Sequence, residues 1–360
     1  MASILNHIKE DHNMWDDMVR QIRADHLGVL VYGNGNSARM IVEKLDPDMR
    51  IEGIVVSHPY FKENTTFCGH PILDADTLQF DMKRDAALIF SICPSAGMVA
   101  WANSITQIRQ VISYDGQQLL FAPMTIGLLR ENERVLTELH DNMADTRSQE
   151  TMRAYLNCRI SGNLDYLAGI SEPDLYFNPT LLHFSEHETF VDCGAYTGDT
   201  VVRFHAFTKG QYERIYAFEP NMQYHDVMER ETGHVQNLHI IKKGLWDRRD
   251  ILRFESERGS MSGIDENGMT SVEVDRMDAM LTDAPVSFIK MNIEGAEYNA
   301  LSGASSIIRR YAPKLAISVY HRPDDLIRIP SLIRGCNPGY RFSLRTHSPG
   351  SGLTVLYAQA

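Results

Sequence analysis

The sequence predicts an α/β protein with two Rossmann-like sheets, of which the second ends in a reversed hairpin. Two observations predict this fold class. Within residues 28–114 and again within 189–320, apolar runs of strand length alternate with helical stretches, which is typical of parallel sheets. The last two strands, expected at 340–346 and 353–358, are joined by a short Pro/Gly/Ser link. A link of that length allows only an antiparallel pair.

Composition places the chain among ordinary globular proteins. Its 360 residues, 43% of them hydrophobic and 23% charged, are enough for two domains that each bury a core. The net charge of −12 disfavours non-specific binding to nucleic acid. Five scattered cysteines without a C-x-x-C pair favour a reducing compartment. No signal peptide and no apolar run of bilayer length stand out, so we expect a cytoplasmic protein without a membrane span.

Changes of periodicity along the chain predict its domain organisation. Helical spacing of apolar residues predicts an N-terminal helix and, later, a polar helical linker. Alternating buried strands and helices predict an α/β domain on each side of that linker. The expected boundaries are residues 1–27 for the helix, 28–130 for a small Rossmann-like domain, 131–186 for the linker and 187–360 for the larger domain.

The turn after the first strand, Gly28–Tyr32, reads GNGNSA at residues 33–38 and nearly matches a dinucleotide fingerprint. The second strand ends at Val56-Ser57, without an acid for a ribose diol. Two interpretations stay open. One is a nicotinamide-linked enzyme that uses this domain. The other, which we favour, is a Rossmann module that serves docking or dimerisation and allows a homo-oligomer.

Aromatic residues gather at the end of the expected linker, at Tyr166, Tyr176 and Phe177. Such residues can form the wall of a ligand site. They are also common in packed cores. The sequence leaves both interpretations open.

The stretch from Thr189 to Asn221 predicts a nucleoside site. It reads as a strand, a glycine turn, a helix and a second strand that stops at Glu219. Gly194 and Gly198 let the backbone approach a ligand, and the helix start offers N–H groups to an anion. Glu219 is placed to accept hydrogen bonds from a ribose diol. Two glycines four apart, with no third, suit the small carboxylate of S-adenosylmethionine better than a pyrophosphate.

The remaining elements complete a second parallel sheet. A turn at Gly244–Asp247 follows one strand at the edge where ligands bind, so Trp246 is expected to stack on an adenine. A parallel sheet with one reversed hairpin is the arrangement of class I methyltransferases. The further strands are expected at 238–242, 251–255, 271–275, 286–292 and 314–320, the helices at 226–232, 277–281, 296–310 and 323–333, and a polar loop at 259–268.

Three segments together resemble the FkbM family of S-adenosylmethionine-dependent methyltransferases. They are FVDCGAYTGDT, YAFEPN and IKMNIEGAEYNAL, followed by AISVYHRPDDLIRIP and TVLYA. The likeness covers residues 176–360, and the helical run before it resembles longer bacterial members with an extra N-terminal Rossmann-like domain. It implies a class I methyltransferase fold and transfer of a methyl group to a hydroxyl oxygen. The acceptor it implies is a small molecule or glycan: a sugar, a glycoconjugate or a polyketide-type product.

The resemblance also implies roles for individual residues. Glu219 would bind the ribose hydroxyls, with Pro220 and Asn221 shaping the adenine pocket. The methionine end would be held by Asp192, Gly194, Ala195, Tyr196, Gly198, Asp199 and Thr200. The reacting centre would be faced by Asn292, Glu294, Glu297 and His321.

Asn292 stands where family members usually carry an aspartate, which keeps the hydrogen-bonding shape but loses a negative charge. A non-catalytic partner subunit therefore remains an alternative. His321 follows a strand tip and is a candidate general base, with Glu294 and Glu297 as alternatives. The structural interpretations are a helix cap for His321 and acids favoured at a helix start for the glutamates. A divalent metal could instead lower the pKa of the acceptor hydroxyl. No spacing among the available oxygen ligands is diagnostic of a metal, so metal dependence stays open and no metal ligand is assigned. These ligands are Asp192, Asp275, Asp278, Asn292 and Glu294.

Overall fold

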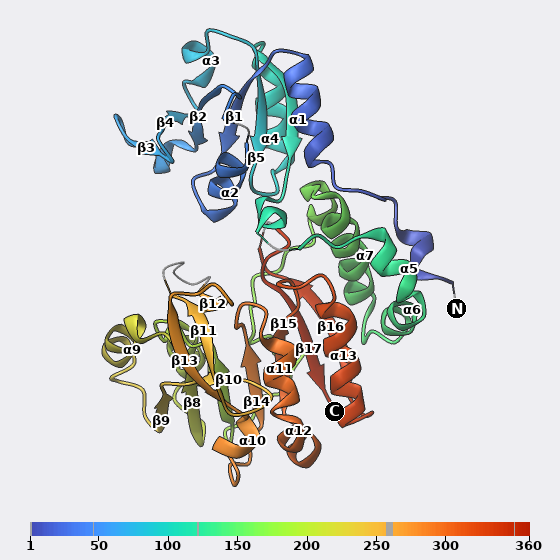
Figure 1. Cartoon of the computed structure of the whole chain (residues 1–360), viewed down its shortest axis with the longest axis vertical. Helices are drawn as coiled ribbons and strands as arrows, with labels where there is room; N and C mark the ends of the chain where they lie inside the picture. The colour runs from blue at the N-terminus through green and yellow to red at the C-terminus, as the bar shows by residue number, and fades with distance from the viewer. Residues whose placement is uncertain (1, 46, 121, 257–261, 349) are drawn as a thin grey trace. The chain divides into compact units, whose positions relative to one another are not determined.

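The computed structural model describes residues 2–45, 47–120, 122–256, 262–348 and 350–360 (Figure 1). Of the expected polar loop at 259–268, residues 259–261 lie outside these ranges. The chain forms two compact units, each with its own sheet. The first comprises residues 1–137, 149–172 and 346–353, and the second comprises 138–148, 173–345 and 354–360.

The first unit is built around a six-stranded sheet in the order β3-β4-β2-β1-β5-β6. All neighbouring strands are parallel except β3, which runs antiparallel to β4. The central strands β1 and β5 are buried at every residue, as expected for a parallel sheet covered on both faces. The strands are β1 Gly28–Tyr32, β2 Ile51–Val56, β3 Thr66–Phe67, β4 His70–Asp74, β5 Ala86–Phe90 and β6 Ile108–Ser113.

The single helix expected at the N-terminus is instead a 3-10 turn, η1, followed by an extended stretch and helix α1. The backbone between them bonds to side chains and carbonyls of α7: Lys9 N donates to Asn157 Oδ1 and Met14 N to Ser161 O. These tertiary bonds replace helical ones. The helices of this half are η1 Ile4–His7, α1 Trp15–Ala24, α2 Asn36–Lys44, η2 His58–Tyr60, α3 Leu78–Asp81, α4 Ala96–Ser104, η3 Gly116–Leu119, α5 Ile126–Glu131, α6 Glu133–Asp141, α7 Thr146–Ser161 and η4 Leu164–Leu167.

The second unit contains a seven-stranded sheet in the order β16-β17-β15-β14-β7-β8-β9. The strands from β15 to β9 in this order are parallel, and β17 pairs antiparallel with β15. A parallel sheet with a reversed strand near its end is the class I methyltransferase arrangement, so the fold class expected from the sequence is confirmed. The strands are β7 Thr189–Cys193, β8 Arg214–Phe218, β9 Leu238–Ile241, β14 Phe288–Met291, β15 Lys314–Ser318, β16 Arg341–Thr346 and β17 Thr354–Gln359.

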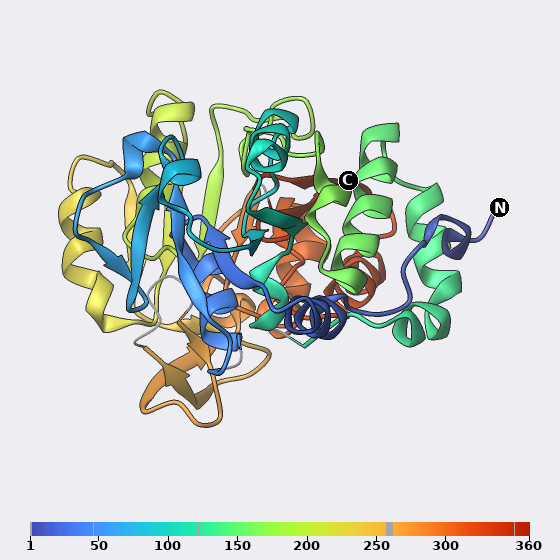
Figure 2. The ribbon, with the colours of Figure 1, turned by 90° about the horizontal axis from the view of Figure 1, so that it is seen from above.

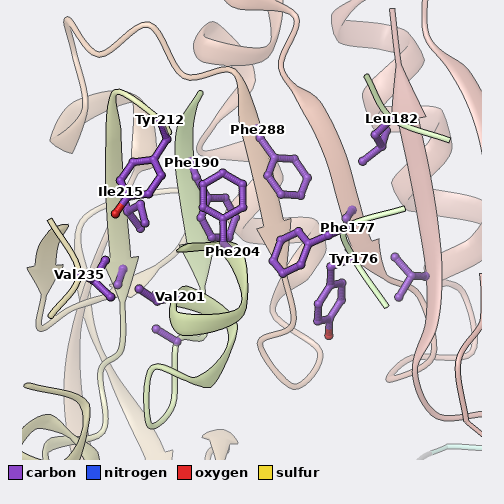
Figure 3. Close-up of a cluster of buried hydrophobic side chains, with 14 of the residues drawn as sticks. Tyr176, Phe177, Leu182, Phe190, Val201, Phe204, Tyr212, Ile215, Val235 and Phe288 are labelled. Atoms are coloured by element: carbon purple, nitrogen blue, oxygen red, sulfur yellow. The ribbon is translucent and has the colours of Figure 1, made fainter. Parts of the chain in front are cut away.

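Aromatic rings form the core on one face of this sheet (Figure 3). Phe190 on β7 stacks on Phe288 of β14 with centroids 5.0 Å apart, and Phe204 lies 4.4 Å from Phe190. Phe177 packs edge-on against Phe190 at 6.0 Å. Phe177 and its neighbour Tyr176 are therefore packed in the core. This is the second of the two interpretations that the sequence left open for them.

The helix expected over 296–310 is divided into α11 and α12 at Gly303. A Cβ at Gly303 would lie 2.0 Å from the carbonyl oxygen of Trp246, so another backbone segment approaches the helix at that point. Sequence periodicity gives no sign of this contact. The helices of this unit are α8 Asp199–Phe207, η5 Met222–Tyr224, α9 His225–Glu231, α10 Met277–Met280, α11 Glu297–Ser302, α12 Ser305–Tyr311 and α13 Asp325–Cys336.

A second, four-stranded sheet is inserted between β9 and β14, in the order β10-β13-β11-β12. Figure 2 shows its strands, in yellow-orange, projecting at one side of the unit. Where a turn was expected after β9, Gly244–Leu245 forms a short strand that pairs with β13. The strands are β10 Gly244–Leu245, β11 Asp250–Glu255, β12 Gly263–Ile264 and β13 Thr270–Asp275.

Candidate functional site

The glycine turn after β7 contains three residues with left-handed backbone. Gly194, Tyr196 and Gly198 have φ of 80°, 51° and 84°, a region that favours glycine. A Cβ at Gly194 would lie 2.2 Å from the carbonyl oxygen of Asn292. Only glycine therefore allows the tips of β7 and β14 to meet, and the turn leads directly into α8.

Burial differs from residue to residue along the turn and the start of α8. Ala195 and Thr200 are buried, whereas Asp199, the first residue of α8, is exposed. The N–H groups of Gly194 and Ala195 both donate to the carbonyl of Phe218 at 3.0 Å. These bonds tie the turn to the end of β8.

Glu219, at the tip of β8, has its carboxylate held by two backbone N–H groups. Oε2 accepts from Tyr196 N and Oε1 from Asn221 N, each at 2.8 Å. Burial raises the pKa of Glu219, while these two N–H groups act to lower it. Each carboxylate oxygen can accept more than one hydrogen bond. The side chain is thus oriented and still able to accept bonds from a diol.

The residues after Glu219 line the same edge. Asn221 Oδ1 accepts from Gln223 N at 3.1 Å, and its Nδ2 donates to the Ser256 carbonyl at 3.2 Å. Pro220 lies against Gly244, the first residue of β10, where a Cβ would be 3.7 Å from the proline Cβ. The turn after β8 is therefore braced by the inserted sheet.

Trp246 follows β10 and packs with the apolar residues of the four-stranded sheet. Its neighbours there are Phe254, Val272 and Val274, and its backbone N donates to Asp275 O at 3.0 Å. These contacts are core contacts. Stacking of this indole on an adenine stays a prediction.

Tyr224 was not predicted, yet it lies beside the glycine turn. Its ring centroid is 4.3 Å from that of Tyr196, whose N–H binds Glu219. The two rings form an aromatic pair next to the carboxylate. Tyr224 is five residues beyond Glu219, and no pattern in the sequence distinguishes it from a surface tyrosine.

Asp192 is fully buried and paired with Lys290 of β14, which sequence reasoning missed. Lys290 Nζ lies 2.8 Å from Asp192 Oδ1 and 2.9 Å from the carbonyl oxygen of Gly194. Burial raises the pKa of Asp192 to about 6, against the opposing effect of Lys290. The sequence feature that could have indicated this ion pair is the presence of a lysine within an otherwise apolar strand. Asp192 thus anchors the glycine turn through Lys290.

Four of the predicted residues meet beyond the tip of β14. Asn292 Oδ1 accepts from the Tyr320 hydroxyl at 3.0 Å. His321 places Nδ1 2.9 Å from Glu297 Oε1 and Nε2 3.3 Å from Glu294 Oε1. Glu294 has a left-handed φ of 54°, which is rare for a residue with a side chain. Such strain is common at functional sites.

The imidazole of His321 lies between two carboxylates. Burial acts against its charged form, but Glu297 and Glu294 outweigh burial and raise the pKa of His321 to about 10. For Glu297, burial acts to raise the pKa, while His321 and the Ile293 N–H, at 2.8 Å, hold it below the usual range. His321 is therefore an imidazolium near neutral pH. The Glu294 side chain, 12% exposed, is more accessible than Glu297 or His321.

Asp325, at the start of α13, joins this cluster and was also missed. Burial, followed by the charge of Glu297, raises the pKa of Asp325 to about 7. One ligand atom each from Glu297, His321 and Asp325 lie within 4.8 Å of one another. This set could hold a metal ion, but the ion pair with His321 already compensates the charge of Glu297. We assign no metal to it.

The N-terminal GNGNSA turn is packed against its own unit at Gly33 and Ser37, whereas the Cβ position of Gly35 is open. A Cβ at Gly33 would lie 2.6 Å from Ser91 Oγ, and one at Gly116 would lie 2.1 Å from Ser37 O. Gly116 N also donates to Ser37 Oγ at 3.0 Å. Gly116, the first residue of η3, therefore packs directly on the first turn of α2, where a fingerprint of this type would bind phosphate. Nucleotide binding by this turn therefore stays an untested alternative.

Comparison with known proteins gives a family-model match to part of the second unit. Residues 192–342 match the model of the Methyltransferase FkbM domain, so the resemblance expected from the sequence is confirmed for this segment. No curated protein matches the chain. Within the described residues, no helix combines the length and apolar character needed to cross a bilayer.

Solved structures give a likeness in fold. Methyltransferase FkbM from Methylobacillus flagellatus KT is 24% identical, with 94% of this chain and 92% of that chain covered and a TM-score of 0.73. An rRNA methylase from Streptococcus thermophilus is 16% identical over 54% of this chain and 92% of that chain, with a TM-score of 0.32. Aeropyrum pernix fibrillarin, solved with S-adenosyl-L-methionine, is 11% identical over 49% of this chain and 70% of that chain, with a TM-score of 0.30.

Proposed function

We propose that the chain is an S-adenosylmethionine-dependent methyltransferase that acts on a hydroxyl group. One observation carries the proposal: Glu219 is held by the backbone N–H groups of Tyr196 and Asn221, at 2.8 Å each, beside a glycine turn. An oriented acid at the tip of the second strand suits a ribose diol. The FkbM domain match over residues 192–342 supports the same cofactor.

The turn between β7 and α8 supports the same assignment. Its glycines, with left-handed φ, let the turn pack against Asn292 and Thr232, and we propose that the helix start beyond it offers N–H groups to a methionine carboxylate. The ribose would be held by Glu219, and the adenine by Pro220, Asn221 and Trp246. The methionine end would be held by the turn and the start of α8, at Gly194, Ala195, Tyr196, Gly198, Asp199 and Thr200, with Asp192 positioning the turn.

S-adenosylmethionine supplies an activated methyl group when it is bound. The protein must then orient the acceptor hydroxyl and take its proton. His321 is protonated near neutral pH, so its ring has no lone pair to offer. We assign proton removal to Glu294, which is the more accessible carboxylate and lies 3.3 Å from His321 Nε2. His321 and Glu297 hold that carboxylate in place.

Asn292 would face the same centre through its amide. Its Oδ1 is occupied by the Tyr320 hydroxyl, so the Nδ2 donors are left for the acceptor or the cofactor. An acceptor that carries hydroxyl or ether oxygens beside the methylated position would use such donors. This favours a sugar, a glycoconjugate or a polyketide-type product.

The direct test is titration calorimetry with S-adenosylmethionine, S-adenosylhomocysteine and NADH in parallel. We expect the two adenosyl ligands to bind at micromolar concentration and NADH not to bind. Glu219→Ala should lose at least about tenfold in affinity, because a hydrogen bond to a charged group contributes roughly 1.5–3 kcal/mol. Binding of NADH alone would overturn the proposal and assign the activity to the first unit.

The acceptor is then sought by methyl transfer from tritiated S-adenosylmethionine. Free sugars, nucleotide sugars and macrolide polyketides make up the first panel. Turnover with a hydroxyl acceptor supports the enzyme. Cofactor binding without turnover on any acceptor would instead favour the non-catalytic alternative that Asn292 raises.

A further inference from the structure

Strand β12, Gly263–Ile264, is the edge strand of the inserted sheet. It pairs antiparallel with β11, with Gly263 opposite Glu255 and Ile264 opposite Phe254. Ile264 packs on the apolar cluster around Phe254. Ile264 thus holds the strand on the sheet, and Gly263 is the residue directly before it.

Gly263 lies directly against Glu294. A Cβ at position 263 would be 2.9 Å from Glu294 Cβ and 3.5 Å from Glu294 O. The near atom is the root of the Glu294 side chain, not its flexible end, so the backbone would have to move to admit a methyl group. Glu294 is also the residue whose carboxylate lies 3.3 Å from His321 Nε2.

Ser262, the residue before Gly263, contacts the cofactor half of the site. Its hydroxyl is a hydrogen-bond partner of the Tyr224 phenol and lowers the pKa of that group, against the larger effect of burial. Tyr224 in turn packs on Tyr196. At the end of the neighbouring strand, the Ser256 carbonyl accepts from Asn221 Nδ2 at 3.2 Å. The inserted sheet therefore contacts both halves of the site through consecutive residues.

We propose that Gly263 is a positioning residue that holds Glu294 against His321. This inference rests on the proposed function. The hydrogen atom of Gly263 leaves room for Glu294 Cβ, which would lie only 2.9 Å from a Cβ at position 263. A side chain at 263 would therefore push Glu294 out of its place, 3.3 Å from His321 Nε2.

The test uses Gly263→Ala, with Gly335→Ala as the matched control. Gly335 lies near the end of α13 and has no atom within 4 Å of its Cβ position, so the control makes the same chemical change in open space. Calorimetry with S-adenosylhomocysteine reports on the cofactor half. The ring resonances of His321, assigned by comparison with His321→Gln, report on the contact between Glu294 and His321 without any acceptor.

We expect Gly263→Ala to bind S-adenosylhomocysteine within about twofold of the wild type, because its contacts lie on the acceptor side. The His321 resonances should shift, and kcat/KM should fall by about tenfold to a hundredfold, because a misplacement of about 1 Å can cost about a hundredfold in rate. Gly335→Ala should match the wild type in all three measurements.

Two outcomes would overturn the inference while the proposed function stands. One is unshifted His321 resonances in Gly263→Ala. The other is a kcat/KM of Gly263→Ala equal to that of the wild type. If the wild type bound neither adenosyl ligand, the proposed function itself would fail. Ser262→Ala provides a second variant that adds no atoms. Because Ser262 contacts Tyr224 and Gly263 contacts Glu294, this variant should leave the His321 resonances unshifted, and a shift equal to that of Gly263→Ala would contradict the role of Gly263.

Discussion

Lys290 and Asp192 face each other on neighbouring strands, with Nζ 2.8 Å from Oδ1 and both side chains buried. The same ammonium donates to the carbonyl of Gly194 at 2.9 Å. The ring of Tyr176 lies beneath it, 5.3 Å from Nζ to the centroid. One buried cation therefore joins β7, β14 and the glycine turn, and it links the stability of the sheet to the shape of the proposed cofactor site.

Removal of Lys290 should destabilise the second unit strongly. Lys290→Met leaves the Asp192 carboxylate buried without its partner, which typically costs about 3–5 kcal/mol in the free energy of unfolding. Urea unfolding measures the change. Lys242→Met is the control, because Lys242 forms an exposed ion pair with Glu229. Equal stability of the two variants would contradict this role, and Lys290→Met with Asp192→Asn should recover part of the loss.

Stability should fall on the alkaline side through His321. The pKa of its imidazole rises from 6.5 to about 10 on folding, because Glu297 and Glu294 outweigh burial. A raised pKa means that the stabilisation is fully present below pH 6.5 and is lost as the pH rises through about 10. The thermal midpoint should therefore decline over this window in the wild type. A parallel decline in His321→Gln would show that other groups cause it.

Glu294 and His321 should affect turnover and not cofactor affinity. Glu294→Gln should lower kcat by about a hundredfold to ten thousandfold, the usual range for a lost general base. His321→Ala should abolish turnover because Glu294 loses its partner. Calorimetry with S-adenosylhomocysteine should give wild-type affinity for both variants. Glu231→Gln, at an exposed position near the end of α9, is the control, and wild-type turnover in His321→Ala would remove His321 from the mechanism.

Asn292→Asp should favour the charged cofactor over the neutral product. The new carboxylate can still accept from the Tyr320 hydroxyl and adds a negative charge at the tip of β14. A sulfonium is attracted by that charge, whereas the thioether of S-adenosylhomocysteine is not. The ratio of the two dissociation constants, measured by calorimetry, should therefore shift towards S-adenosylmethionine. An unchanged ratio would show that position 292 does not face the sulfur.

The local part of the site was predictable from the sequence. Glu219 could be placed because an acid directly after a short apolar strand must lie at the edge of the sheet. Gly194 could be placed because a turn between a strand and a helix requires backbone freedom. Both rules depend on neighbours in the chain. The strand β7 accordingly begins at Thr189, where the predicted strand begins, and ends directly before Gly194.

Contacts between distant segments were not predictable. Lys290 and Asp192 are 98 residues apart, and the pattern of either strand is equally compatible with a lysine on a solvent-exposed face. The break between α11 and α12 depends on the carbonyl of Trp246, which periodicity within a helix does not record. Gly263 resembles any loop glycine until the position of Glu294 is known.

The sequence by itself determined the alternation of the main strands and helices and the residue types gathered at the ends of β7 and β8. These follow from short-range rules of burial, turn geometry and strand ends. Only the tertiary structure decided the charge state of His321, because the pKa of an imidazole depends on carboxylates that folding brings together. It also decided that Tyr176 and Phe177 are core residues and that β12 lies against Glu294, since packing is a property of surfaces that meet across the fold.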